Sequence, residues 1–172
     1  LINAKGSPGG LRGSKTSALE GGIRVPAVIW WKGVIENSKS EQFFFVQDIL
    51  PTLLTATNIG ISENANFDGE DKWINLITKK IIPPKNAFIG ARVIADERAL
   101  LNGEWKLYST KPQMVPLSPS YSLFNIIKDP FETNDLSSSE PKIFNEMKMV
   151  LSSLPERDVV GDMNPAHSYL HG

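Results

Sequence analysis

The sequence of 172 residues contains no cysteine. Structural disulfides, thiolate metal sites and a cysteine nucleophile are therefore excluded from it, although the absence of cysteine does not fix the compartment. Long hydrophobic runs are also missing. The longest strictly apolar runs cover only residues 27–31 and 43–46, whereas a membrane span needs about 20 residues. No basic start leads into an apolar run, so we expect any signal peptide to lie upstream of Leu1.

An excess of charge of one sign is missing too. The 18 lysine and arginine residues nearly balance the 19 aspartate and glutamate residues, which leaves a formal net charge of −1. Such a chain has no global field that would attract nucleic acid or an anionic membrane, and we expect neither as a partner. The hydrophobic content of 41% is enough for one ordinary domain or for the end of a larger one.

The first third of the chain combines a glycine-rich stretch with two apolar elements. Residues 5–15 are typical of a shaped loop. Residues 23–31 are rich in β-branched and aromatic side chains and predict a strand buried on both faces, as in a parallel sheet covered by helices. The apolar spacing that follows predicts a helix over 48–58 with Asp48 as its cap. One strand cannot form such a sheet, so we expect the other strands to come from sequence before Leu1 or from another chain.

The second half of the chain predicts short strands followed by a helix. Asn102 and Gly103 separate two apolar-alternating runs and favour a hairpin with a type I′ turn. A helix is predicted from about Ser139, with apolar residues along one face. The fold class expected is α+β, with a small antiparallel sheet and a packed C-terminal helix. The predicted strands cover residues 87–95, 98–101, 104–108 and 121–127.

The loop at residues 10–16 (GLRGSKT) carries the pattern most relevant to function. Its glycines allow backbone amides to approach an anion, and Arg12 and Lys15 add positive charge, which predicts an oxyanion site. A phosphate loop is a weaker interpretation, because Ser14 replaces its second glycine and the glycine pair at 21–22 would break the helix that should follow. A solvated basic loop without a ligand remains the alternative.

Two neighbouring motifs carry a resemblance to a known family. Residues 11–16 (LRGSKT) and 20–26 (EGGIRVP) are similar to the LRGxK and EGG[IV]RVP signature of the type I sulfatases, members of the alkaline-phosphatase superfamily. The resemblance spans residues 11 to about 154 and implies the C-terminal portion of an arylsulfatase-like enzyme. Further similar motifs are residues 47–54 (QDILPTLL), 67–69 (FDG), 98–108 (RALLNGEWKLY) and 123–136 (LFNIIKDPFETNDL).

The resemblance also implies an arrangement of domains. The sheet and helix of the second half would be preceded by the last strand and helix of an α/β sulfatase catalytic domain. The predicted boundaries are 1–60 for the end of the catalytic domain, 61–86 for a connection, 87–155 for the antiparallel subdomain and 156–172 for a tail.

In this family a hydrated formylglycine, made from cysteine or serine, attacks sulfur, and a calcium ion polarises the sulfate. A lysine of LRGxK binds a sulfate oxygen, which implies that role for Lys15. Arg12 would bind substrate through the same positive field or, alternatively, pair with Glu20. Glu20, Arg24 and Asp48 are interpreted as structural: a loop anchor, a strand-end ion pair and a helix cap.

The family's nucleophile and calcium ligands have no counterpart that we assign in this chain. Asn3 lies where an Asp-Asn metal pair would end, but no aspartate precedes it. We therefore expect Ca²⁺ and formylglycine in the full-length parent, no metal bound by this chain, and no activity of the chain alone. The implied partners are a sulfate ester, aryl or sugar, and the N-terminal catalytic portion of the same protein. A periplasmic or secreted location is implied as well.

Two alternative functions stay open. One is a related hydrolase of phosphate or phosphonate esters, because one cation does not distinguish tetrahedral oxyanions. The other is a noncatalytic module that binds an anion or a glycan.

Three further features are interpreted as structural. Residues 153–157 (SLPER) match the SxPxR of serine-type sulfatases, but Glu156 replaces a small residue and the position suits a helix end. His167 and His171 lie in a nonperiodic tail, where solvated side chains are the default. Core packing is favoured over a sugar platform for the tryptophans at positions 30, 31, 73 and 105.

Overall fold

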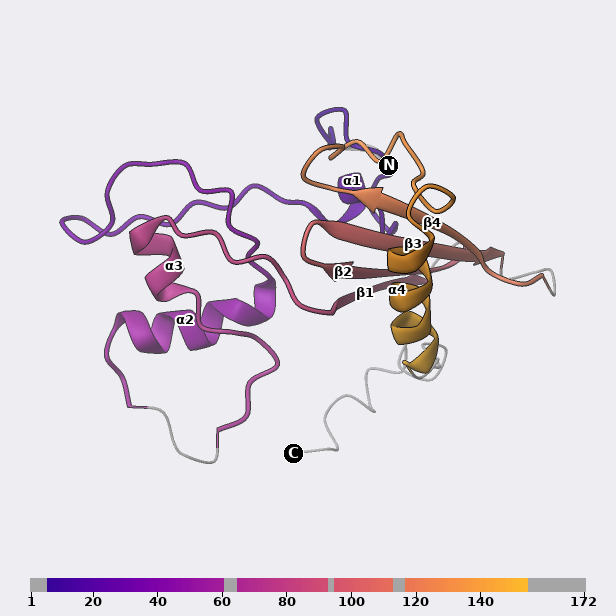
Figure 1. The fold of residues 1–172 in the computed structure, drawn as a ribbon. Coiled ribbons are helices and arrows are strands. Elements are labelled where there is room, and N and C mark those ends of the chain that lie inside the picture. The colour runs from indigo at the N-terminus through magenta and orange to yellow at the C-terminus, as the bar shows by residue number, and fades with distance from the viewer. Residues whose placement is uncertain (1–5, 61–64, 93–94, 113–116, 155–172) are drawn as a thin grey trace, which may run out of the picture. The chain divides into compact units, whose positions relative to one another are not determined.

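The computed structural model describes residues 6–60, 65–92, 95–112 and 117–154, and they form two compact units (Figure 1). The first unit combines the described residues of Leu1–Val25 and Lys85–Gly172, and the second is Pro26–Pro84. The opening segment thus groups with the C-terminal sheet. The predicted assignment of residues 1–60 to the end of a catalytic domain stays a prediction.

The first unit is built on a four-stranded antiparallel sheet in the order β1-β2-β3-β4. Each strand pairs with its neighbour in sequence, and the register aligns Leu100, Leu107 and Leu123 across three strands. The predicted α+β class with a small antiparallel sheet is confirmed. The strands are β1 Ala87–Arg92, β2 Ala95–Asn102, β3 Trp105–Pro112 and β4 Ser120–Asn125.

The predicted hairpin between β2 and β3 is present, but its turn differs from the expected one. Asn102 pairs with Trp105, so Gly103 and Glu104 are the two turn residues. Gly103 has a φ of +64°, and neither Asn102 nor Glu104 has a positive φ. A positive φ at the first turn residue alone is typical of a type II′ turn, so the type I′ prediction was wrong.

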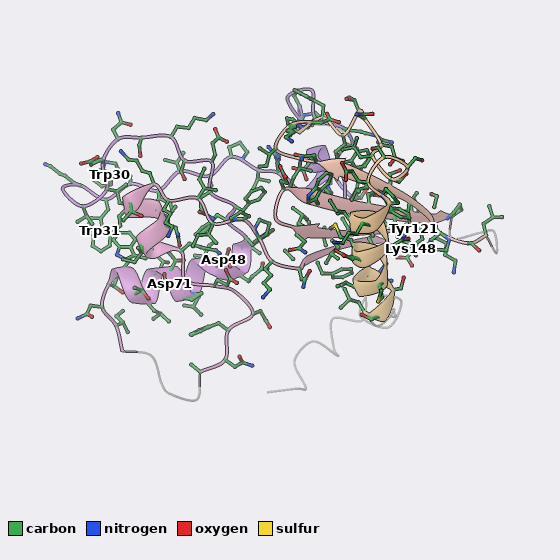
Figure 2. All side chains as sticks on the ribbon, viewed as in Figure 1. Trp30, Trp31, Asp48, Asp71, Tyr121 and Lys148 are labelled. Atoms are coloured by element: carbon green, nitrogen blue, oxygen red, sulfur yellow. The ribbon has the colours of Figure 1, made fainter. Side chains whose placement is uncertain are left out.

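Helix α4, Pro141–Ser153, covers one face of the sheet (Figure 1). Met147 and Leu151 are buried against the aligned leucines of β2, β3 and β4. At the edge of this core, Tyr121 meets Phe144 edge-to-face with ring centroids 6.4 Å apart, and the Lys148 ammonium lies 4.7 Å from the Tyr121 ring (Figure 2). The predicted C-terminal helix and its apolar face are confirmed.

The opposite face of the sheet is covered by the opening segment of the chain. Because side chains alternate along a strand, Lys106 and Phe124 point away from α4. Both are buried, with exposed fractions of 0% and 1%. They lie against residues 11–24, which include the short helix α1, Glu20–Ile23.

The second unit contains η1 Val46–Asp48, α2 Ile49–Ala56 and α3 Trp73–Thr78. Helix α2 confirms the helix predicted over 48–58. Asp48 does not cap it: the carboxylate accepts hydrogen bonds from the backbone N–H groups of Phe45 and Glu70, at 2.9 and 2.8 Å. The predicted cap was wrong because Asp48 lies at the end of a 3₁₀ turn and joins it to Glu70, directly after the FDG segment, instead.

The strand predicted over 23–31 is not present. Residues 24–31 are not paired in a sheet, and Val25, Val28 and Trp30 have exposed fractions of 80%, 91% and 79%. Trp31 instead lies 5.8 Å from the ring of Trp73 within the second unit (Figure 2). A parallel strand needs hydrogen-bonding neighbours on its flanks, and no described segment supplies them. Within the described residues, no helix is long and apolar enough to cross a membrane.

Candidate functional site

The glycine-rich loop closes tightly on itself and on helix α1. The backbone N–H of Gly21 donates to the carbonyl of Arg12 at 2.7 Å. A Cβ atom on Gly21 would lie 2.7 to 2.8 Å from the carbonyl oxygens of Leu11, Arg12 and Gly13. Only glycine tolerates this approach, so the EGG motif fixes the path of the LRG motif.

Lys15 lies at the tip of a tight turn. The backbone N–H of Ser17 donates to the carbonyl of Ser14 at 3.0 Å, which places Lys15 and Thr16 at the two central positions. Thr16 has a φ of +81°, uncommon for a β-branched residue. The Lys15 side chain is exposed, and no ion pair or hydrogen bond joins its ammonium to another described residue. The turn therefore presents one exposed cation.

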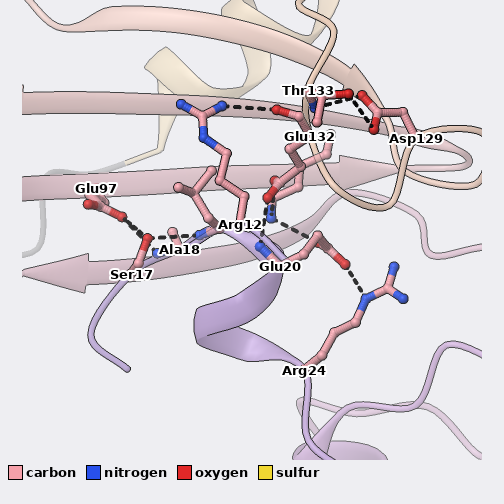
Figure 3. A network of polar contacts seen from close by, with 11 residues as sticks. Arg12, Ser17, Ala18, Glu20, Arg24, Glu97, Asp129, Glu132 and Thr133 are labelled. Atoms are coloured by element: carbon pink, nitrogen blue, oxygen red, sulfur yellow. Dashed lines mark hydrogen bonds and ion pairs between the residues drawn. The ribbon is translucent and has the colours of Figure 1, made fainter. Parts of the chain in front are cut away.

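Arg12 is directed toward the C-terminal part of the chain. Its guanidinium donates to the backbone carbonyl of Glu132 at 3.0 Å and lies 5.8 Å from the centre of the Phe124 ring (Figure 3). The alternative pair between Arg12 and Glu20 is not formed, because Glu20 pairs with Arg24 and Lys106. The predicted substrate contact of Arg12 stays a prediction.

A buried ion cluster lies beneath the loop. The ammonium of Lys106 lies 2.8 Å from Oε1 of Glu20 and 2.8 Å from Oε1 of Glu132. The side chains of these three residues are 0%, 3% and 0% exposed. Glu20 also pairs with the half-exposed Arg24 (Figure 3). Two cations thus balance two anions, and the loop-anchor role expected for Glu20 is confirmed. Arg24 forms the expected ion pair, but at the end of α1 and not at a strand end.

The second carboxylate of this cluster comes from a turn held in an unusual conformation. Glu132 has a φ of +54°, and its Oε2 accepts the backbone N–H of Glu20 at 2.9 Å. Asp129 accepts the backbone N–H groups of Thr133 and Asn134 at 2.8 and 2.9 Å. Slight burial acts to raise the pKa of Asp129, but these hydrogen bonds outweigh it and lower the pKa below 3.8. The DPFETN turn therefore directs Glu132 into the sheet.

A third acidic residue, Glu97, binds the C-terminal end of the Lys15 turn. Oε2 of Glu97, on β2, accepts the hydroxyl of Ser17 at 2.7 Å and the backbone N–H of Ala18 at 2.8 Å (Figure 3). Burial raises the pKa of the nearby Tyr108 above 10.0, and the charge of Glu97 adds to the increase. Tyr108 therefore stays neutral at physiological pH. The residues that follow Lys15 are attached to the sheet through Glu97 and through Lys106.

These contacts define what the loop can do chemically. The buried ammonium of Lys106 is neutralised by Glu20 and Glu132, whereas Lys15 is exposed and can attract a tetrahedral anion. Among the described residues, no group of three or more histidine, cysteine, aspartate or glutamate side chains could hold a metal ion. The described residues therefore do not fit a calcium site by themselves.

Some sequence predictions fall at or beyond the limits of the described residues. Ser153 ends α4, with its hydroxyl donating to the carbonyl of Val150 at 2.8 Å, as expected for a helix end. Residues 155–157 of the SLPER motif lie outside the described residues. So do Asn3, His167 and His171.

Comparisons with known proteins relate these motifs to one family. The model of the family described as Sulfatase matches residues 3–59. N-acetylgalactosamine-6-O-sulfatase of Bacteroides thetaiotaomicron is 23% identical over 91% of this chain and 32% of its own length. Human steryl-sulfatase is 28% identical over 84% of this chain and 30% of its own length. This chain is similar to the C-terminal part of named sulfatases.

The fold agrees with this relationship. A solved Bacteroides thetaiotaomicron structure, titled for the metabolism of multiple glycosaminoglycans, covers 84% of this chain with a TM-score of 0.66 and 24% identity. The chain spans only 32% of that protein, and about a third of the sulfatases above. The likeness to this structure is one of fold.

The structure shows why the sulfatase motifs occur together. LRGSKT and EGGIRVP supply the loop, the strand motif GEWKLY supplies Lys106, and the DPFE motif supplies Glu132. The sequence did not single out Lys106, Glu97 or Glu132 as parts of the site. The available signal was a lysine between apolar residues in the predicted strand 104–108, since a buried lysine needs a counter-charge.

Proposed function

We propose that this chain is the C-terminal portion of a sulfatase that hydrolyses a sulfate ester, and that Lys15 binds an oxygen of the sulfate group. The relationship to named sulfatases supports the reaction class. The observation that carries the residue assignment is the turn itself, which presents Lys15 to solvent from a backbone attached to the sheet at Glu20 and at Glu97.

The proposed role of Lys15 is electrostatic. During cleavage of the S–O bond, negative charge develops on the oxygens around sulfur and on the leaving oxygen. An ammonium already in place stabilises this charge without reorganising at the moment of reaction. Residues outside this chain would supply the nucleophile, for which the family uses formylglycine.

The leaving group is not assigned to one compound. The two relatives above are named for an amino-sugar sulfate and for a steryl sulfate, so relatives of this chain differ in that part of the substrate. We propose only the class, an aryl or sugar sulfate. The proposed partner of the chain is the N-terminal catalytic portion of the same protein.

The test is a substitution of Lys15 in the complete enzyme. We expect Lys15→Ala to lower kcat/KM for a chromogenic aryl sulfate by about 10²- to 10³-fold, the usual effect of losing one positioned group that stabilises transition-state charge. Lys142→Ala is the matched control, because Lys142 is an exposed lysine of α4. Wild-type kcat/KM in Lys15→Ala would refute the assignment of Lys15.

A further inference from the structure

The least expected feature of the loop is the lysine beneath it. Lys106 is the second residue of β3 and is fully buried, and its ammonium contacts carboxylates that are far from it and from each other in sequence. Burying three charged groups is unfavourable unless all are paired, and apolar side chains of similar volume would often stabilise such a site as well or better. Stability alone therefore does not explain why the cluster is ionic.

The cluster has a direct connection to the Lys15 turn. Glu20 is five residues from Lys15, its side chain is held by Lys106 and its backbone N–H by Glu132. The next residue, Gly21, is bonded to the carbonyl of Arg12. A displacement of Glu20 must therefore move the segment from Arg12 to Gly21.

Arg12 connects the N-terminal end of the Lys15 loop to the same ion cluster. Its guanidinium binds the carbonyl of Glu132, whose carboxylate contacts Lys106. The two ends of the Lys15 loop are thus held by one residue of the DPFE motif and one residue of β3. No contact is formed between Lys106 and Lys15, so any effect of Lys106 on an anion must act through the backbone of the loop.

We propose that Lys106 is a positioning residue, which holds Glu20 and Glu132 so that the Lys15 ammonium meets the sulfate group in a fixed place. This inference rests on the proposed function of Lys15 and makes the C-terminal sheet a working part of the sulfate site. Lys106 neither touches the substrate nor transfers a proton.

The test is a double-mutant cycle on kcat/KM in the complete enzyme, with Lys106→Met and Lys15→Ala. In the wild-type background we expect Lys106→Met to lower kcat/KM by about 10- to 100-fold, the effect of misplacing a catalytic group by about 1 Å. In the Lys15→Ala background the same change should lower kcat/KM less than about threefold, because the group that it positions is gone. Lys106→Arg keeps the charge and should restore part of the activity.

Two results would overturn the inference. One is an equal loss from Lys106→Met in both backgrounds, which would mean that Lys106 acts independently of Lys15. The other is full activity of a folded Lys106→Met enzyme. Wild-type kcat/KM in Lys15→Ala would instead refute the proposed function, so the two failures are distinguishable.

A second variant and a second readout cover the case in which Lys106→Met does not fold. Glu132→Gln keeps the shape of the side chain and can still accept the N–H of Glu20, and the same cycle applies to it. Hydrogen exchange of amides 12–22 in this chain should be at least tenfold faster in Glu132→Gln than in Lys142→Met. Unchanged exchange would contradict the inference whatever the activity.

Discussion

Beneath the loop, each charged side chain is paired with a side chain of opposite charge. Lys106 is balanced by Glu20 and Glu132, and Arg24 balances the remaining negative charge. Glu20 of the opening segment pairs with Lys106 of β3, and Glu132 accepts the backbone N–H of Glu20, so the charges attach that segment to the sheet. The stability of the first unit and the shape of the loop therefore respond to the same residues.

Removing one charge from the cluster should be costly. We expect Lys106→Met to lower the free energy of unfolding by about 3–5 kcal/mol, because Glu132 stays buried without a counter-charge and Glu20 keeps only its pair with the half-exposed Arg24. Chemical denaturation of the chain measures this change in the free energy of unfolding. The triple variant Lys106→Met, Glu20→Gln, Glu132→Gln should recover most of the loss, and Lys142→Met should stay within about 0.5 kcal/mol of the wild type. A triple variant as unstable as the single one would contradict the role of charge balance.

The carboxylate of Asp135 should make the free energy of unfolding depend on pH. Partial burial acts to raise the pKa of Asp135, but hydrogen bonds from the backbone N–H groups of Ser137 and Leu123 outweigh it, and the pKa is lowered from 3.8. The folded state thus favours the carboxylate. This stabilisation is present above pH 3.8 and is lost as the pH falls through the lower folded pKa.

We therefore expect the melting temperature of the wild type to fall between pH 5 and pH 3, and to fall less in Asp135→Asn. Glu146→Gln, which removes an exposed carboxylate of α4, is the control. An identical pH profile for wild type and Asp135→Asn would show that Asp135 contributes nothing.

At the scale of elements, the loop and α1 act as one packed piece. The backbone approach at Gly21 leaves no room for a side chain, so the LRG and EGG motifs depend on each other. The sheet provides two separate surfaces: one carries the leucine core beneath α4, and the other carries the charged cluster beneath the loop.

A methyl group at position 21 should disrupt the packing of the loop against α1. We expect Gly21→Ala to lower the free energy of unfolding by about 1–3 kcal/mol, the usual cost of overpacking, because its Cβ would meet three carbonyl oxygens. Gly6→Ala is a matched control, since no atom lies within 4 Å of its added Cβ. Equal stability of the two variants, measured by thermal unfolding, would contradict the tight loop.

Elements with local determinants were predictable from sequence. Helices α2 and α4 follow the spacing of their apolar residues, and the β2–β3 hairpin follows its turn residues. The segment 23–31 failed because a parallel strand depends on partners that spacing does not reveal. Lys106 was missed for a similar reason: its partner Glu20 lies 86 positions away, and only the folded sheet brings them together.

On the scale of the whole molecule, the chain carries apolar surface that its own described residues leave uncovered. Val25, Val28 and Trp30 are largely exposed, although their composition suits a buried strand. The proposed N-terminal catalytic portion would cover such a segment. The relatives, of which this chain spans about a third, are long enough to contain it.

The chain alone should therefore be catalytically silent. We expect no hydrolysis of an aryl sulfate by the purified 172-residue chain, because no nucleophile is assigned to it. The complete enzyme, assayed at the same concentration, is the positive control. Turnover by the chain alone, retained in Lys15→Ala, would contradict both the partial nature of the chain and the role of Lys15.

The most direct test of the account is the position of the Lys15 ammonium in a crystal structure of the complete enzyme with sulfate or a sulfate ester bound. The account predicts that Nζ of Lys15 lies about 2.7–3.2 Å from a sulfate oxygen, with Lys106 still between Glu20 and Glu132. The account would be contradicted by a Lys15 side chain directed into solvent, with Nζ more than about 6 Å, twice the length of a hydrogen bond, from every sulfate oxygen.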